Sequence, residues 1–299
     1  MKRIRTELTD MLGIAYPIIG APMFLISYED LAVAVSEAGG LGTIPLPNYR
    51  TILSLETALA NIRSRTDRPI GVNIHLSGRF PWKEQLAACL NAGVSFFITS
   101  LGDPRLILED VHANGGKVFA DVVTLRQALN AAERSVDGII AVSEGAGGHA
   151  GIIPVMIFVP YITSRIDLPV IAAGGISTGV QMAAALALGA CGVVVGTRLI
   201  ATPEAQASDA YKQALIAAGP EDIIYTDRVT GNPANWLAHS IENLENAPQI
   251  GSKRWRDLWS AGKSVAQVDD IKPAGAILEE LVRDYQKSVE SLPLVQGDS

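Results

Sequence analysis

The stretch PVIAAGGISTGVQMAAALALGACGVVVGTR, residues 169–198, decides the fold. It begins with a short β-branched run that ends in two glycines, and a Ser-Thr pair then opens an Ala-rich segment with helical spacing. That segment closes at Gly189, and a second apolar run follows at 192–197. Strand, helix and strand in this order form a crossover unit whose two strands are parallel, so this part of the chain is of the α/β class.

The same alternation extends toward the N-terminus. A capping-box-like Ser27-Tyr28-Glu29-Asp30 opens the helix after the first strand, and Gly39-Gly40 ends it. The even spacing, with no G-x-G-x-x-G after the first strand, favours a closed (β/α)8 TIM barrel over an open doubly wound sheet. The eight predicted strands are 17–22, 41–46, 69–76, 95–100, 117–123, 138–143, 169–175 and 192–197.

The pattern changes after the eighth strand. Residues 203–218 are predicted to form the last barrel helix, and 274–290 a final amphipathic helix. Between them, 220–262 is rich in Pro and Gly, holds three of the four tryptophans and predicts an irregular cap. We expect residues 1–219 to form the barrel and 220–299 a C-terminal cap and helix packed on the same domain. The cap either packs on the outside of the barrel or helps to close its pocket.

Composition narrows the class of protein. The 299 residues are 48% hydrophobic and 18% charged, which suits a sheet that is buried on both faces. The net charge is −7 and no Lys/Arg cluster occurs, so no nucleic-acid or membrane partner is expected. The two cysteines form no disulfide framework, the N-terminus does not read as a signal peptide, and a cytoplasmic protein is expected. No metal site is predicted, because no His or acidic pair has ligand spacing.

The ends of strands seven and eight predict a phosphate site. Strand seven ends in Gly174-Gly175 and strand eight in Gly196-Thr197. The loops after these two strands bind phosphate in many such barrels, and glycine lets backbone N–H groups approach an anion closely. The helix that begins near Ser177 is expected to add its positive N-terminal end.

A glycine-rich loop follows strand six. Residues 144–151 hold four glycines around His149, so a flat ring system can lie against the loop with the histidine as its functional group. A neutral imidazole can accept a proton from carbon or hydrogen-bond a substrate oxygen at neutral pH. His75 lies near the end of strand three and is a second candidate, whereas His112 falls in a predicted helix and His239 in the cap.

Three further strand ends carry polar or unusual residues. Strand one ends in Ala21-Pro22-Met23, whose backbone groups can read the edge of a heterocycle. Strand three carries Asn73, whose amide can both donate and accept at a pyrimidine-like ring edge. Strand five carries Asp121, and a hydroxyl-rich ligand chain is one partner that a buried carboxyl group there could have.

Taken together, these motifs resemble the nitronate monooxygenase (2-nitropropane dioxygenase-like) family of FMN-dependent barrels, from about Pro17 to Tyr285. Three positions depart from that family: Gly145, where members often have Glu or Gln; Asp121, where they often have Lys; and the apolar 24–26 segment. With the 46–47 loop, that segment predicts an apolar pocket. The matching stretches are 20–23, 38–42, 71–73, 146–151, 169–176, 196–198, 210–213 and 259–262.

The resemblance implies roles for individual residues. His149 matches the active-site histidine of the family. Contacts to the flavin ring would come from Ala21, Pro22, Met23, Asn73, Gly147 and Gly148, and contacts to the phosphate from Gly174, Gly175, Gly196 and Thr197. Asp121, from its place at a strand end, and Ala146, from its place in the glycine-rich loop, are further predicted cofactor-binding residues.

The resemblance implies an FMN-dependent oxidoreductase that oxidises alkyl nitronates to a carbonyl compound and nitrite with O2. An NAD(P)H-dependent FMN reductase acting on a quinone or an enoyl thioester is the alternative. Two other hypotheses stay open: an isomerase or aldolase, for which Lys117 is poorly placed at the start of its strand, and a non-catalytic flavin-binding protein. The natural substrate, the use of NAD(P)H and the oligomeric state, a homodimer included, are left undecided.

Overall fold

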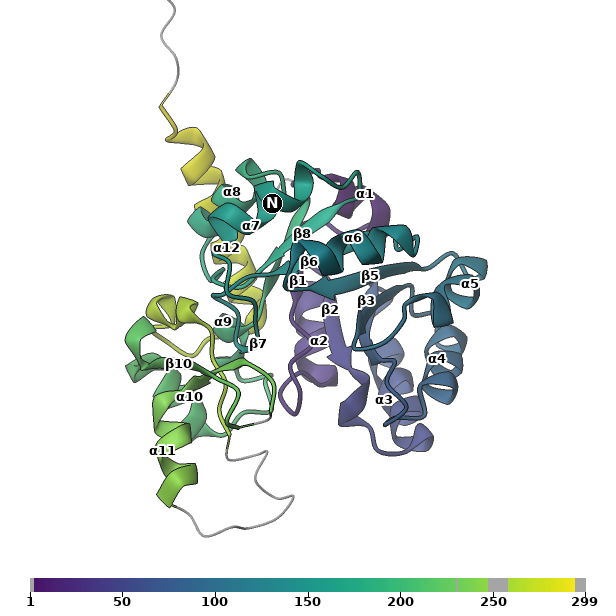
Figure 1. The fold of residues 1–299 in the computed structure, drawn as a ribbon, viewed down its shortest axis with the longest axis horizontal. Helices are drawn as coiled ribbons and strands as arrows, with labels where there is room; N and C mark the ends of the chain where they lie inside the picture. The colour runs from purple at the N-terminus through teal and green to yellow at the C-terminus, as the bar shows by residue number, and fades with distance from the viewer. Residues whose placement is uncertain (1–2, 230, 247–257, 294–299) are drawn as a thin grey trace, which may run out of the picture.

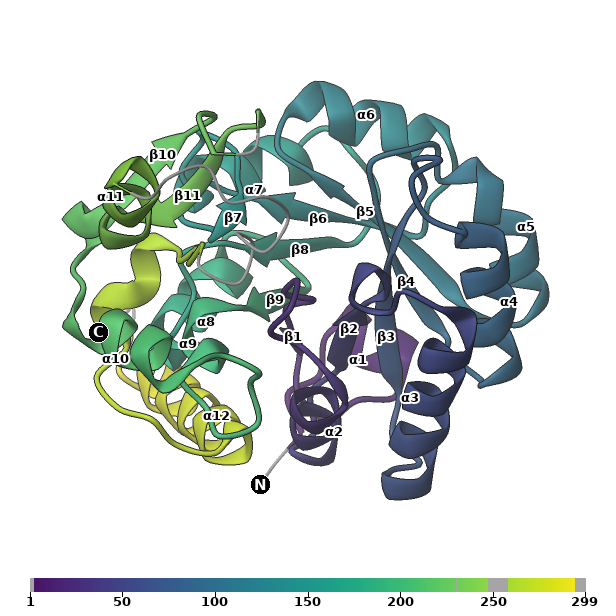
Figure 2. The same ribbon diagram turned by 90° about the horizontal axis from the view of Figure 1, so that it is seen from below.

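The computed structural model describes residues 3–229, 231–246 and 258–293. Eight parallel strands form one sheet in the order β1-β9-β8-β6-β5-β4-β3-β2, and a parallel bridge between Ile19 and Leu41 joins its two edge strands (Figures 1 and 2). The predicted barrel and all eight of its strands are therefore confirmed. The strands are β1 (Ile18–Gly20), β2 (Gly42–Pro45), β3 (Ile70–His75), β4 (Phe96–Ser100), β5 (Lys117–Val122), β6 (Gly138–Val142), β8 (Val170–Ala173) and β9 (Gly192–Val195).

Apolar side chains fill the barrel. Phe96 and Phe119 are fully buried, and their rings pack with centroids 5.0 Å apart. Leu8, from the short helix α1 (Glu7–Leu12), belongs to the same cluster, so the N-terminal segment covers one end of the barrel interior. That end holds the N-terminal ends of the strands, because a β-carbon on Gly192, the first residue of β9, would lie 2.3 Å from Leu8. The opposite end, where the strands finish, is left for a site.

Seven outer helices each follow a barrel strand. The helix after β1 begins at Glu29 with Tyr28 as its N-cap, and no side chain caps it. The predicted capping role of Ser27 is therefore wrong: its hydroxyl donates instead to the carbonyl of Ala21 at 2.8 Å. The helices are α2 (Glu29–Glu37), α3 (Ile52–Arg65), α4 (Trp82–Asn91), α5 (Arg105–Ala113), α6 (Leu125–Glu133), α7 (Val155–Thr163) and α8 (Gly179–Ala187); the 3-10 turn η1 (Leu46–Asn48) follows β2.

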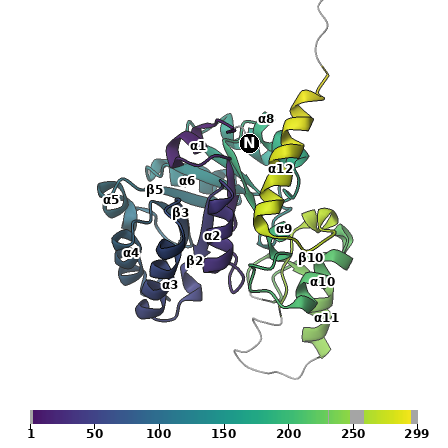
Figure 3. The same ribbon diagram turned by 180° about the vertical axis from the view of Figure 1, so that it is seen from behind.

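The eighth outer position is taken by the last helix of the chain. Helix α12 (Ala274–Glu290), predicted at these same bounds, packs between α8 and α2 (Figure 3). Gly179 permits the contact with α8, since a β-carbon there would lie 2.2 Å from the backbone of α12. The prediction that 203–218 forms the last barrel helix is wrong. The helix found there, α10 (Asp209–Ala217), packs away from the barrel because its apolar face completes a different cluster.

That cluster is the centre of the cap, which the structure defines as α10 through η4. A three-stranded antiparallel sheet, β10-β11-β7, joins the cap to the barrel, because β7 belongs to the loop after β6 (Figure 2). Tyr211 and Trp259 stack with centroids 5.1 Å apart inside the cap. The cap elements besides α10 are η2 (Pro220–Asp222), β10 (Ile223–Thr226), β11 (Ala234–Leu237), α11 (Ala238–Asn246) and η4 (Lys263–Gln267), and the two-residue strand that pairs with them is β7 (Gly148–His149). The predicted cap residue Trp255 lies outside the described residues.

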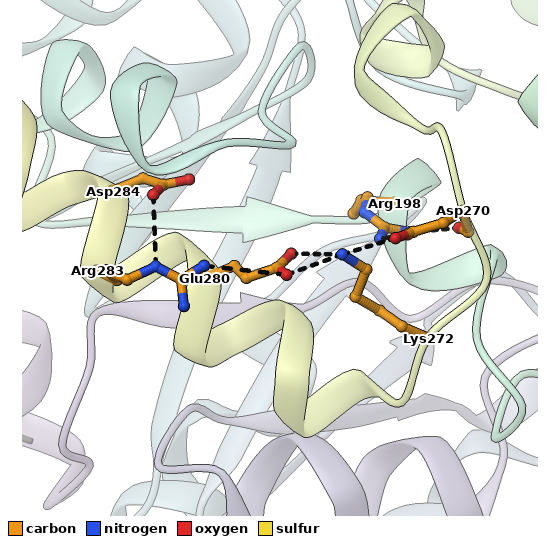
Figure 4. A network of polar contacts seen from close by, with 6 residues as sticks. All are labelled: Arg198, Asp270, Lys272, Glu280, Arg283 and Asp284. Carbon is orange, nitrogen blue, oxygen red and sulfur yellow. Dashed lines mark hydrogen bonds and ion pairs between the residues drawn. The ribbon is translucent and has the colours of Figure 1, made fainter.

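A chain of ion pairs ties the end of β9 to α12 (Figure 4). The buried Arg198, in the short helix α9 (Thr197–Ile200), pairs with Asp270, which also accepts from Lys272 at 2.7 Å. Lys272 in turn pairs with Glu280 of α12 at 2.8 Å. The segment that leads into α12 is therefore anchored at the barrel end where the predicted site lies. Within the described part of the chain, no helix is long and apolar enough to cross a membrane.

Candidate active site

The predicted site residues gather where the barrel strands end. Asn73 and Asp121 lie near the C-terminal ends of β3 and β5, Gly174-Gly175 follows β8 directly, and Gly196-Thr197 follows β9. His149 lies in β7, which pairs with the cap. One end of the barrel therefore carries every predicted position.

Unpaired donors line the ends of β8 and β9. The backbone N–H groups of Gly174, Ile176 and Gly196 donate no hydrogen bond to any described residue. The hydroxyl group of Ser177 is buried and also has no partner among them. Gly175 has φ +78°, and a β-carbon there would meet nothing closer than 4.0 Å. We call these residues the donor cradle: Gly174, Gly175, Ile176, Ser177, Gly196 and Thr197. Ile176 and Ser177 are buried, and Gly174 and Gly196 are half-buried. Buried donors need an acceptor, and phosphate oxygens supply several.

Two predicted contributions to this cradle need correction. The N–H groups of Ser177 and Thr178 donate to the side chain of Gln181 at 2.7 and 3.1 Å, so the start of α8 is capped from within. It therefore cannot offer these two groups to an anion. The N–H of Gly175 donates to the carbonyl of Gly145 at 3.1 Å and is likewise occupied. The free donors are those of the strand ends.

A hydrogen-bonded chain crosses β3, β4 and β5 at the same end of the barrel as the cradle. The amide nitrogen of Asn73 donates to the hydroxyl of Ser100 at 2.7 Å, and that hydroxyl donates to Asp121 at 2.7 Å. The same amide nitrogen also donates to the carbonyl of Ile98 at 3.2 Å, which fixes its orientation. The acceptor oxygen of Asn73 has no partner among the described residues. Ser100 had no predicted role, and its only signal in the sequence was its place at the end of strand four.

The carboxyl group of Asp121 has a pKa above the ordinary value for aspartate. Desolvation by the surrounding protein raises the pKa of Asp121 to about 6, although the hydrogen bond from Ser100 acts to lower it. Its side chain still has access to solvent at the barrel mouth. The carboxyl group can therefore hold or release a proton near neutral pH.

Two histidines share this end of the barrel. Desolvation by the surrounding protein lowers the pKa of His149, which favours the neutral ring at pH 7, although the residue is exposed. The pKa of His75 is lowered by burial first, and then by the charges of Arg79 and His149. Its Nδ1 shares a hydrogen bond with Ser77 at 2.8 Å, and its ring meets the edge of Phe80. The influence of His149 on His75 places both rings near the same mouth.

The turn after β1 differs from the prediction in its hydrogen bonds. The N–H of Ala21 donates to Val195, and the N–H of Met23 donates to Ala21 and to Ser27. These two donors are therefore not free to read a ring edge. Contact between this turn and a flavin, Pro22 included, stays a prediction.

The predicted apolar pocket stays a prediction, and its two segments differ in exposure. Phe24 is 46% exposed and can line an opening, whereas Leu46 is fully buried in the protein core. Leu25 adopts φ +61°, a conformation that is uncommon outside glycine. Its N–H donates to the side chain of Asn48 at 2.7 Å, and this bond helps to hold the turn.

The glycines of the loop after β6 have different neighbours. A β-carbon on Gly147 would lie 2.9 Å from Ala261 and Gly262 of the cap, so this glycine is required by the approach of the cap. Gly148 has φ +68°, and a β-carbon there would make only an ordinary contact, with the Ser260 hydroxyl at 3.9 Å. Ala146, between them and Gly145, is half-buried. Its predicted contact with a flavin is not tested by these neighbours. Among the described residues no group of His, Cys, Asp or Glu is arranged to hold a metal ion.

This combination of a parallel barrel, a donor cradle after the last two strands and a neutral histidine on a glycine-rich loop defines a barrel oxidoreductase of the flavin-dependent class. The family model of nitronate monooxygenase matches residues 5–80 and 76–254. The chain belongs to the nitronate monooxygenase family, and the resemblance that its motifs predicted is confirmed.

Individual relatives differ in their names. The chain is 31% identical to the nitronate monooxygenase of Pseudomonas aeruginosa, over 81% of this chain and 82% of that protein. It is 30% identical to the (3aS,4S,5R,7aS)-5-hydroxy-7a-methyl-1-oxo-octahydro-1H-indene-4-carboxyl-CoA dehydrogenase of Rhodococcus jostii, over 90% and 81%. The solved structure of FabK from Thermotoga maritima superposes with a TM-score of 0.85 at 32% identity, covering 96% of this chain and 98% of that one. The nitroalkane oxidase of Streptomyces ansochromogenes gives 0.83 at 26% identity, covering 96% and 99%.

Proposed function

We propose that this chain binds FMN and oxidises alkyl nitronates to a carbonyl compound and nitrite with O2. The observation that carries the proposal is the donor cradle, whose unpaired N–H and O–H groups suit a phosphate group at the place where barrels of this kind bind one. A cytoplasmic location is part of the proposal, supported by the free thiols of Cys89 and Cys191.

The residues present fit the parts of FMN. Gly174, Gly196 and Ser177 would donate to the phosphate oxygens. The free acceptor oxygen of Asn73 would take a hydrogen bond from the flavin ring, and Asp121 would accept from a hydroxyl of the ribityl chain. When bound, the flavin supplies the electron acceptor that none of the twenty side chains provides.

His149 would bind the substrate and accept its proton. Because its lowered pKa keeps the ring neutral at pH 7, one ring nitrogen can accept the carbon-bound proton of a neutral nitroalkane. The other ring nitrogen carries a proton and can donate to an oxygen of the nitro or nitronate group. Phe24 would exclude water from the apolar side of the opening.

The test is a comparison of substrates on the purified protein. We expect bound FMN in the visible spectrum, and nitrite formation coupled to O2 uptake when an alkyl nitronate is added. His149→Ala should retain FMN and lose roughly 10²- to 10⁴-fold in turnover of a neutral nitroalkane, the usual contribution of a general base. His112→Ala is the matched control, because His112 pairs with Asp137 at the other end of the barrel. A colourless protein that cannot be reconstituted with FMN would refute the cofactor assignment.

A second candidate is an NAD(P)H-dependent FMN reductase that acts on a thioester. The observation in its favour is the relative from Rhodococcus jostii, whose name specifies a carboxyl-CoA substrate. Loss of the flavin absorbance on anaerobic addition of NADH or NADPH, with nitronates inert, would replace the first proposal by this one.

A further inference from the structure

The carbonyl groups of the loop that carries His149 are bound by donors from the cap. The carbonyls of Glu144 and Ala146 accept from the side-chain nitrogen of Asn235 at 2.8 and 2.7 Å. The carbonyl of Ala150, at the far end of the loop, accepts from the hydroxyl of Tyr225 at 3.2 Å. The cap therefore supplies partners to three carbonyl groups of the loop, which would otherwise lose their hydrogen bonds.

Gly145, between the two carbonyls that Asn235 binds, is held from two sides. Its carbonyl accepts from the N–H of Gly175 and from the N–H of Lys263, each at 3.1 Å. The first bond comes from the donor cradle and the second from the cap. The backbone around Gly145 therefore lies where the two parts of the site meet.

Asn235 is the central member of these contacts. It is 1% exposed, and both of its amide hydrogens are used on the loop. Two carbonyl acceptors at hydrogen-bond distance fix which end of the amide is nitrogen. Its strand, β11, pairs with β7 so that Ala234 lies opposite His149 and Asn235 opposite Gly148. One residue thus binds the start of the loop through its side chain and belongs to the strand that aligns the histidine.

We infer that Asn235 is a positioning residue for His149: it fixes the loop that places the imidazole over the substrate. The inference rests on the proposed function of His149. It predicts that loss of the amide displaces the imidazole without removing the donor cradle. Displacements of about 1 Å cost on the order of 100-fold in rate when they misalign a reacting group.

The experiment compares Asn235→Ala with wild-type holoenzyme and with Asn114→Ala. Asn114 is the matched control, because its side chain also donates to a carbonyl, that of Asp110 at 2.8 Å, but on the exposed end of α5. We expect Asn235→Ala to retain FMN and to lose roughly 10- to 100-fold in kcat on the nitroalkane, with a smaller change in KM. Amide hydrogen exchange in residues 144–151 should accelerate, and the NMR titration of His149 should move up toward the ordinary histidine pKa as its surroundings open to water.

The outcomes separate this inference from the proposed function. Wild-type protein that turns over neither nitronates nor NAD(P)H-driven acceptors refutes the proposed function, while exchange and the His149 titration still decide the role of Asn235. Unchanged exchange and an unchanged His149 titration in Asn235→Ala would overturn the inference, as would an unchanged kcat in an active enzyme. If Asn235→Ala does not fold, Asn235→Ser keeps one O–H donor for one of the two carbonyls and is measured in the same way.

Discussion

Replacing Asp121 by asparagine should stabilise the flavin-free protein at neutral pH. The difference between the ordinary Asp pKa of 3.8 and the folded-state value of about 6 corresponds to at most ~3 kcal/mol of unfavourable free energy in the ionised folded protein. Because the side chain has access to solvent, water screens much of this cost, and about 1 kcal/mol is expected. The asparagine side chain would keep a similar shape and has no charge to desolvate.

The dependence on pH has a definite sign. Below the unfolded-state pKa both states hold the proton, so the carboxyl group costs nothing there. As the pH rises through the window from about 4 to about 6, the unfolded chain ionises first and the folded protein loses stability relative to it. Asp121→Asn should therefore match wild type at low pH and exceed it by about 1 kcal/mol above pH 7, a rise in Tm of about 2 °C for a chain of this size.

Urea unfolding of the two proteins at a series of pH values measures this difference directly. Asp137→Asn is a control of opposite sign. Burial acts to raise the pKa of Asp137, but hydrogen bonds from Val118, His112 and Lys117 outweigh it and lower that pKa. Its replacement should cost stability at neutral pH, and this cost should shrink as the pH falls through the lowered folded-state pKa. If Asp121→Asn and wild type show parallel pH profiles, the reasoning about Asp121 is refuted.

Three other substitutions, the last with a matched control, test the framework of the site. Gly179→Ala should destabilise the protein by about 3 kcal/mol in urea unfolding. The added β-carbon would lie 2.2 Å from the backbone of α12 and force α8 and α12 apart. Near-wild-type stability would contradict this packing. Asp270→Asn should cost about 2 kcal/mol, because Arg198 stays buried without its anion. The cost is less than for a fully buried pair, because the Asp270 side chain is 44% exposed. A loss below ~0.5 kcal/mol would show that the backbone carbonyl of Asp270 alone satisfies the guanidinium. Gly175→Ala and Gly13→Ala should each cost about 1 kcal/mol of stability, because both glycines have positive φ and nothing lies closer than 4.0 Å to the β-carbon position. Only Gly175→Ala should weaken FMN binding in a fluorescence titration. Equal FMN affinities of the two variants would show that Gly175 does not belong to the cradle.

The barrel was predictable because its signals are local. Each strand is a short apolar run with turn residues beside it, and each crossover helix has its own periodicity, so pattern and spacing identify eight units. The final helix was also found at its observed bounds, Ala274–Glu290. Its place in the ring of helices was not predicted. Periodicity shows that a helix has an apolar face but not which surface covers that face, so 203–218 was given the position that α12 occupies.

The site was predictable to the extent that it depends on strand ends. Asn73, Asp121 and the glycines after β8 and β9 do lie at one end of the barrel, because parallel strands all finish there. The hydrogen bonds among them were not predictable. Ser100 donates to Asp121 across neighbouring strands, and Gln181 turns back on the N–H groups before its own helix. The first bond does not follow from the residue types. The second has a signal in the sequence, because Thr178 and Gln181 have the spacing of a capping box.

The cap shows most clearly why a local reading of the glycines was incomplete. From the sequence, the glycines of the loop after β6 indicated a surface against which a flavin can lie. In the structure a β-carbon on Gly147 would lie 2.9 Å from Gly262 of the cap, and one on Gly262 would lie 2.2 Å from the carbonyl of Gly145. Two segments far apart in the sequence thus require small residues of each other, and this requirement holds without any ligand. A glycine-rich loop at a barrel mouth can therefore be explained by cofactor, by cap or by both. In this loop Gly148 is the glycine that the approach of the cap does not require, because a β-carbon there would meet only the Ser260 hydroxyl, at 3.9 Å.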